Sequence, residues 1–160
     1  MTDNQASDKA AAEPFILFEL ADTTYGVRSQ GVQQVEMVEH ITPVPNAPPA
    51  VEGVIFSRGQ VIPAINLRVR FGFEKTAHDL RTRLVIVNTK GRAVGLIVDS
   101  AREFISIPSS AIQPPNETIS GLKGKYLEAI ATLGERIILI LDVDEIIDLA
   151  ENLTVASENA

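Results

Sequence analysis

The chain alternates short apolar runs with polar turns, a pattern that is typical of a β-rich protein. Val and Ile dominate the runs, and their β-branched side chains favour strands. Four pairs of runs, each joined by a short polar or glycine-containing segment, predict β-hairpins. The predicted hairpins cover residues 15–27, 54–67, 83–99 and 126–141, with turns at 21–24, 57–60, 88–91 and 134–135.

The segments between these hairpins add less regular elements. Residues 32–38 leave two alternatives open, either a helical turn that runs into a strand or a strand with a bulge. Residues 42–49 contain four prolines and must form an extended loop. Residues 101–107 predict a further strand, and residues 144–153 a short amphipathic helix with acids in its first turn. Short strands separated by frequent turns favour small barrels or a sandwich over a parallel α/β sheet.

The ends of the chain differ from its middle. Residues 1–14 are polar and aperiodic, which predicts a disordered arm, and residues 151–160 predict a flexible acidic tail. Residues 15–150 then form the folded domain. No apolar run approaches the roughly 18 residues of a membrane span, and the first residues lack the features of a signal peptide. We therefore expect a cytoplasmic protein without direct membrane insertion.

The net charge of −7 is unevenly distributed. Of the 21 acids, six lie in residues 142–160, where there is no base, so the rest of the chain has 15 acids against 14 bases. A nearly neutral body argues against a nucleic-acid-binding protein, which usually has a clearly basic face. The alternative of a small-barrel nucleic-acid binder would use the Arg-rich residues 58–83, with Phe71 and Phe73 as stacking platforms. We expect the isolated chain to be a monomer.

Candidate catalytic and metal-binding residues are sparse. The chain has two histidines and no cysteine, too few ligands for a zinc site. His40 and His78 lie far apart in polar connections, which indicates solvated side chains. Asp142, Asp144 and Glu145 lack the glycine and distal glutamate of a calcium loop and fit the start of a helix better. The sequence therefore predicts a protein that is not an enzyme and carries no cofactor or metal.

Residues 51–71, VEGVIFSRGQVIPAINLRVRF, resemble the signature hairpin of the CheW family, the coupling proteins of bacterial chemosensory arrays. Segments at residues 25–27, 32–33, 41–45, 93–107 and 126–141 also match the family's order and spacing, so the resemblance spans residues 15–149. It implies a mainly β fold of two small five-stranded SH3-like β-barrels that share an apolar seam, with one or two short helices. The chain ends can be exchanged between the barrels.

The resemblance also implies a function and partners. Members of this family are non-enzymatic adaptors that couple the cytoplasmic hairpin tips of chemoreceptors to the histidine kinase CheA. They are cytoplasmic proteins recruited to receptor arrays at the inner face of the membrane. The kinase contact would be made with the regulatory domain of CheA, which has the same fold as the adaptor.

Six positions of this chain correspond to the receptor-facing surface of the family. An amphipathic helical hairpin docks best into an apolar groove with a few polar contacts, and Arg58, at a hairpin tip, would fix its orientation. For Val32 and Val35 the alternative is a place in the barrel core. For Gly53 the alternative is a strand bulge. Many relatives have Glu at position 34, which could pair with Arg58, whereas Gln offers only a neutral hydrogen bond. The six positions are Val32, Gln34, Val35, Gly53, Arg58 and Phe104.

Five further positions correspond to kinase contacts, which would fall on both barrels. On one barrel the alternative is that Ile41 and Val44 pack beneath the proline-rich loop. On the other barrel the alternative is that residues 113–118 form a solvated turn. At position 118 a small Thr replaces a bulky apolar anchor, which raises the alternative of a competitor that binds receptors without activating the kinase. The five positions are Ile41, Val44, Gln113, Glu117 and Thr118.

Overall fold

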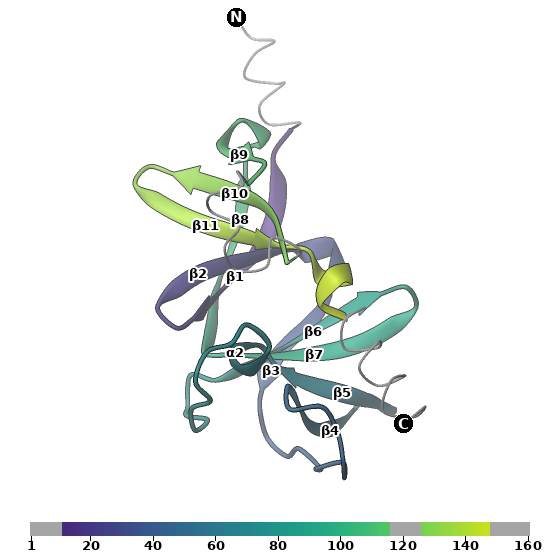
Figure 1. Ribbon diagram of the computed structural model, residues 1–160. Coiled ribbons are helices and arrows are strands. Elements are labelled where there is room, and N and C mark those ends of the chain that lie inside the picture. The colour runs from purple at the N-terminus through teal and green to yellow at the C-terminus, as the bar shows by residue number, and fades with distance from the viewer. Residues whose placement is uncertain (1–10, 116–125, 148–160) are drawn as a thin grey trace, which may run out of the picture.

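The computed structural model describes residues 11–115 and 126–147, which form two packed β-sheets (Figure 1). The first sheet, sheet A, is built from both ends of the described chain and has the strand order β8-β1-β2-β11-β10-β9. All its neighbouring strands are antiparallel except β2 and β11. Its strands are β1 (Glu13–Leu20), β2 (Thr23–Arg28), β8 (Ser100–Ile107), β9 (Ile112–Gln113), β10 (Leu127–Leu133) and β11 (Arg136–Leu141).

The second sheet, sheet B, is formed by the middle of the chain in the order β3-β6-β7-β5-β4. Only β5 and β7 are parallel. One turn of helix, α2 (Leu67–Arg70), follows β5, and single 3-10 turns precede β3 and β9. The strands of sheet B are β3 (Val32–Met37), β4 (Val51–Ser57), β5 (Gln60–Asn66), β6 (Arg83–Thr89) and β7 (Arg92–Val98).

The four predicted hairpins are confirmed. The backbone conformation of their turns explains why the chain reverses at these points. In the β4–β5 turn both Arg58 and Gly59 have positive φ, of 50° and 81°. In the β6–β7 turn Lys90 and Gly91 likewise have φ of 54° and 76°. Two consecutive residues with positive φ are characteristic of type I′ turns, whose twist matches that of the flanking strands.

Three boundaries differ from the sequence-based expectation. The first strand begins at Glu13 rather than at residue 15. Pro14 lies opposite Ser106 of β8, but pairing with β2 begins only at Phe15, so Pro14 has a neighbouring strand on one side alone. The strand predicted over 61–67 ends at Asn66, whose side chain accepts a hydrogen bond from Val69 N and begins α2. The predicted C-terminal helix is described over residues 143–147, and its remainder lies outside the described residues.

The core has three apolar clusters. One cluster fills the concave side of sheet A and another that of sheet B. The largest cluster lies between the sheets and forms a seam, which also buries Ile146 and Ile147 of the C-terminal helix. In Figure 1 this helix (yellow) lies between the two sheets. Buried side chains of the seam from both sheets include Phe18, Tyr25, Val85 and Leu96.

The expected fold class is confirmed, because the protein is mainly β with two small sheets and an apolar seam. Two details differ from a pair of closed five-stranded barrels. Sheet A has a sixth strand, because the short segment Ile112–Gln113 pairs with Ile130 and Ala131. The backbone ladders also leave both sheets open, with β8 and β9 at the edges of one and β3 and β4 at the edges of the other.

Candidate interaction site

Two of the predicted receptor-facing side chains are exposed on the seam-facing sides of their sheets. Val35 lies opposite Val85, which is buried in the seam, and Phe104 lies opposite Ile16, which packs against the seam. Residues directly opposite one another in antiparallel strands point to the same face. Val35 and Phe104 are nevertheless 37% and 64% exposed. They therefore offer apolar surface at the margins of the seam.

A β-bulge decides which residues of β3 share this face. The register shifts between Val32 and Gln34, so the strand alternative for residues 32–38 is correct. Val32 lies opposite Val87 and packs on the seam, although without the bulge Val32 and Val35 would point to opposite faces. Met37, two residues beyond Val35, points the same way and is 53% exposed. The alternation of the sequence alone could have suggested Met37.

Gln34 makes hydrogen bonds within sheet B, and its predicted contact with a receptor stays a prediction. Its side chain donates hydrogen bonds to Ser57 Oγ, at 3.1 Å, and to a carboxylate oxygen of Glu36. Ser57 is on β4 and Gln34 on β3, so the amide connects the two open edges of sheet B. Among the described residues, Gln34 forms no hydrogen bond with Arg58, so it does not hold the Arg58 side chain.

Gly53 lies where another segment of the same chain, at Ile41 and Thr42, closely approaches its backbone. A Cβ atom at this position would lie 2.1 Å from the carbonyl oxygen of Thr42 and 2.9 Å from a methyl group of Ile41. Thr42 pairs with Val54 through two backbone hydrogen bonds of 2.8 Å, which cover the edge of β4. The register also shifts between Val51 and Gly53, which corresponds to the bulge alternative. A receptor contact at Gly53 stays a prediction.

Arg58 occupies the tip of the β4–β5 hairpin, as the sequence suggested. No hydrogen bond or ion pair of its guanidinium group occurs with the described residues. Below the tip, Phe56 and Val61 form a directly opposed pair whose side chains are 75% and 65% exposed. This pair was not among the predicted site residues, although positions that face each other across a two-residue turn could have revealed it.

The predicted kinase contacts are only partly described. Ile41 packs against the interior cluster of sheet B, whereas Val44, after it in the proline-rich loop, is 42% exposed. Gln113 is exposed on β9. Glu117 and Thr118 lie outside the described residues. The exposed candidates among the described residues are thus Val44, in the loop between β3 and β4, and Gln113, on β9 of sheet A.

A partly buried ion pair connects the two sheets. Arg68, on α2, donates two hydrogen bonds of 2.7 Å to the carboxylate of Asp99, which precedes β8. The same carboxylate accepts a hydrogen bond of 2.9 Å from the backbone N–H of Ala21, in the β1–β2 turn. Partial burial opposes ionisation, but the hydrogen bonds from Arg68 and Ala21 outweigh it and lower the pKa of Asp99.

We expect Asp99→Asn to lower the free energy of unfolding at pH 7 by about 2 kcal/mol, because the guanidinium of Arg68 loses its partner. The pKa of Asp99 is lower in the folded protein, so its contribution is present above the unfolded pKa and disappears as the pH falls through the folded pKa. Urea unfolding from pH 7 to about pH 3 should show a weaker acid destabilisation in the variant.

The control for this prediction is Glu103→Gln, which removes a bidentate pair with Arg136 at 2.7 and 2.8 Å. Both of those side chains are 40% exposed, so we expect a loss of only about 0.5 kcal/mol. Equal losses for Asp99→Asn and Glu103→Gln would contradict the proposed role of the Arg68–Asp99 pair in joining the sheets.

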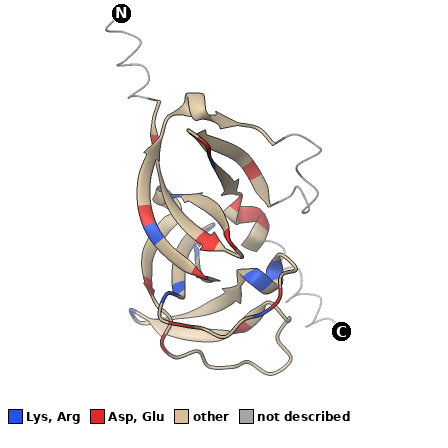
Figure 2. Ribbon diagram, turned by 90° about the vertical axis from the view of Figure 1, so that its left-hand side faces the viewer, with Lys and Arg blue, Asp and Glu red and all other residues tan. Residues whose placement is uncertain are grey.

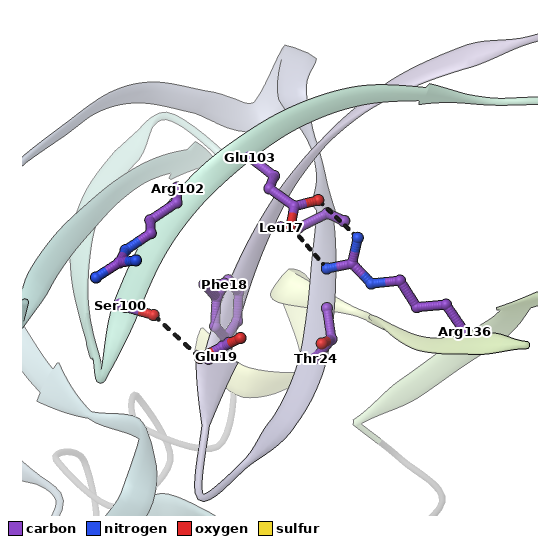
Figure 3. A pocket seen from close by; sticks show the side chains of 8 residues that line it. All are labelled: Leu17, Phe18, Glu19, Thr24, Ser100, Arg102, Glu103 and Arg136. Atoms are coloured by element: carbon purple, nitrogen blue, oxygen red, sulfur yellow. Dashed lines mark hydrogen bonds and ion pairs between the residues drawn. The ribbon is translucent and has the colours of Figure 1, made fainter. Parts of the chain in front are cut away.

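A pocket on sheet A contains the ion pair between Glu103 and Arg136 (Figure 3). Its charged groups are largely occupied, since Arg136 pairs with Glu103 and Ser100 Oγ lies 3.4 Å from a carboxylate oxygen of Glu19. No histidine lines the pocket to activate a hydroxyl group as a nucleophile. The pocket is lined by Leu17, Phe18, Glu19, Thr24, Ser100, Arg102, Glu103 and Arg136.

The distribution of charge supports protein binding rather than phosphate binding. In Figure 2 the basic positions are dispersed among acidic ones and do not form one continuous basic face. Within residues 11–115 and 126–147 there is no group of three or more His, Cys, Asp or Glu side chains suited to a metal ion. The described part of the chain also has no helix long and apolar enough to cross a membrane.

Together, the described residues form two sheets with apolar side chains exposed beside the seam, an arrangement suited to a scaffold or adaptor protein that binds other proteins. A profile of the CheW-like domain matches residues 14–151. The chain therefore belongs to the CheW family, whose members take part in chemotaxis signalling as adaptors.

Named relatives support this assignment. The chain is 28% identical to the chemotaxis protein CheW of Klebsiella aerogenes, covering 94% of this chain and 90% of the relative. It is 32% identical to the chemotaxis protein CheW of Thermotoga maritima, with coverages of 73% and 78%. The crystal structure of the scaffolding protein TtCheW from Thermoanaerobacter tengcongensis superimposes with a TM-score of 0.75 at 34% identity, covering 82% of this chain and 89% of that chain.

Proposed function

We propose that this protein is a non-enzymatic adaptor that binds the cytoplasmic hairpin tip of a chemoreceptor and the regulatory domain of a CheA-type histidine kinase. It would act in the cytoplasm, at receptor arrays on the inner face of the membrane. The observation that carries the proposal is the exposure of Val35 and Phe104 on the seam-facing sides of two different sheets. Family membership supplies the classes of partner.

The receptor contact would combine apolar area with a directed charge. Val35, Met37 and Phe104 supply exposed apolar surface at the margins of the seam. A helical hairpin presents apolar side chains at spacings of three and four residues, which fits such a surface. Arg58 would orient the partner through a bidentate hydrogen bond to a carboxylate of the receptor.

The kinase contact would use surfaces away from the seam. Val44, in the loop that connects β3 and β4 of sheet B, and Gln113, on β9 of sheet A, are both exposed. Two separate surfaces would let one adaptor contact two kinase domains while a receptor occupies the seam. Glu117 and Thr118 would extend the second of these surfaces.

We expect Arg58→Asp to weaken receptor binding by at least about tenfold, because it replaces a charge-assisted donor by a like charge. The turn should survive, since Asp tolerates the positive φ of 50° at this position. The measurement is the dissociation constant for the isolated cytoplasmic hairpin of the cell's own receptor, with circular dichroism as the test of folding.

A matched control is Lys90→Asp, which makes the same charge reversal at the corresponding position of the β6–β7 turn, where φ is 54°. Equal affinities of the Arg58→Asp variant and the unmodified protein would remove Arg58 from the receptor site.

Reconstitution with receptor and kinase tests the coupling itself. Stimulated autophosphorylation supports an adaptor, whereas saturable receptor binding without stimulation supports a competitor.

A further inference from the structure

The chain crosses from sheet B to sheet A at a single residue, Asp99. This residue alone separates the end of β7 at Val98 from the start of β8 at Ser100. Its backbone N–H donates a hydrogen bond of 3.0 Å to the carbonyl oxygen of Glu19 on β1. The backbone at this crossing is thus held against sheet A.

The side chain of Asp99 connects this crossing to both sheets. Its two carboxylate oxygens accept hydrogen bonds of 2.7 Å from Nε and Nη2 of Arg68, on the helix α2 that directly follows β5 of sheet B. One of these oxygens also accepts the hydrogen bond of 2.9 Å from the N–H of Ala21, in the β1–β2 turn of sheet A. The side chains of Arg68 and Asp99 are only 19% and 31% exposed, so salt screens the pair less than a surface pair. We call Arg68, Asp99 and Ala21 the crossing clamp.

The apolar seam and the crossing clamp hold the two sheets in different ways. Apolar burial is non-directional, so the seam resists separation of the sheets more than it resists a change in the angle between them. A bidentate pair of a guanidinium and a carboxylate has a defined geometry, because two parallel hydrogen bonds must both stay aligned. The crossing clamp is therefore suited to fix the angle between the sheets.

That angle determines the spacing of the two exposed apolar side chains at the seam. Phe104 lies five residues beyond Asp99, about 16 Å along β8 at the usual rise of a strand. Val35 lies on β3 of the other sheet, which begins directly after the other crossing, at residues 29–31. At this distance, a rotation of about 10° around the clamp would move Phe104 by about 3 Å relative to Val35. A binding site that uses both side chains needs them held to within about 0.5 Å.

We propose that Asp99 is a positioning residue for the receptor site. Through Arg68 and Ala21 it sets the angle between the sheets, and this angle sets the spacing of Val35 and Phe104. Asp99 acts through the fold and not by a contact with the receptor. The effect on binding rests on the proposed function, whereas the fixed angle does not.

The first test is the affinity for the isolated receptor hairpin at pH 7, at a temperature where circular dichroism shows every variant fully folded. Asp99→Asn should weaken binding by about fivefold, because the receptor must then bring the two sheets into register itself. The control is Glu128→Gln, which removes an ion pair with Arg28 within sheet A and should leave the affinity unchanged.

The second test measures the angle without any partner. The chain has no cysteine, so two introduced cysteines can be spin-labelled specifically. Val61→Cys on β5 and Ile137→Cys on β11 place one label on each sheet, at side chains that are 65% and 59% exposed. We expect the distribution of distances between the labels, measured by double electron–electron resonance, to broaden in Asp99→Asn and to stay the same in Glu128→Gln.

The proposal is wrong if Asp99→Asn binds the receptor hairpin as tightly as the unmodified protein, or if the label distances do not broaden. Equal broadening in Glu128→Gln would also overturn it, because the loss of any ion pair would then loosen the sheets. Failure of the proposed function gives a different result. In that case the label distances still broaden in Asp99→Asn, but the unmodified protein binds no receptor hairpin.

Discussion

Replacing Gly53 by Ala should destabilise the protein by about 3 kcal/mol and lower its melting temperature by roughly 10 °C. The added methyl group would lie 2.1 Å from the carbonyl oxygen of Thr42 and 2.7 Å from its carbonyl carbon, and neither is a flexible side-chain atom. The loop would have to move away, which strains both backbone hydrogen bonds between Thr42 and Val54. Thermal unfolding followed by circular dichroism measures the loss.

Gly31→Ala is the matched control for this prediction. An added Cβ at Gly31 meets no atom within 4 Å, and the residue lies in the 3-10 turn before β3. We expect a change of at most about 0.5 kcal/mol there. If Gly53→Ala unfolded at the same temperature as Gly31→Ala, the close contact with Thr42 could not be what requires glycine.

Replacing Phe104 by Glu should weaken binding of the receptor hairpin by roughly 30-fold, as expected for a central apolar anchor of an interface. The side chain is 64% exposed, so a charged group remains hydrated in the free protein and the fold is retained. Val35→Glu should act in the same direction, because Val35 offers exposed apolar surface on the seam-facing side of the other sheet. Isothermal titration with the purified receptor hairpin measures both effects.

The control is Leu80→Glu, which introduces the same charge at an apolar side chain that is 84% exposed. Leu80 lies in the segment between α2 and β6 and is not part of the strands that carry Val35 and Phe104. Its substitution should leave the affinity unchanged. A loss of affinity for Leu80→Glu as large as that for Phe104→Glu would point to a general effect of charge and not to an apolar site at the seam.

The two predictions depend on different kinds of contact. The role of Gly53 follows from an approach of two backbone segments within the chain, so it can be tested without any partner. The role of Phe104 follows from exposed apolar area and from the family's partners. If the Phe104→Glu variant keeps a stable fold but loses receptor binding, Phe104 belongs to an interface and not to the core.

Local patterns were sufficient to predict the four hairpins and their turns, although they left residues 32–38 open and did not indicate the short strand β9. Each turn has its own chemical signal, such as Arg58-Gly59 and Lys90-Gly91, where positive φ favours glycine. The alternation of buried and exposed residues also gave the mainly β class. Boundaries were less accurate where a side chain decided them, as at Asn66, whose hydrogen bond to Val69 N ends the strand and begins α2.

The sequence by itself thus determined the hairpins, the family and the candidate residues, because turns and strand patterns are local. Only the tertiary structure decided which candidates share a surface. The bulge after Val32 turns Val32 and Val35 to the same face, and long-range pairing places Thr42 over Gly53 and Gln34 against Ser57. Contacts between distant segments depend on strand register and on packing across the seam, which no short stretch of sequence encodes.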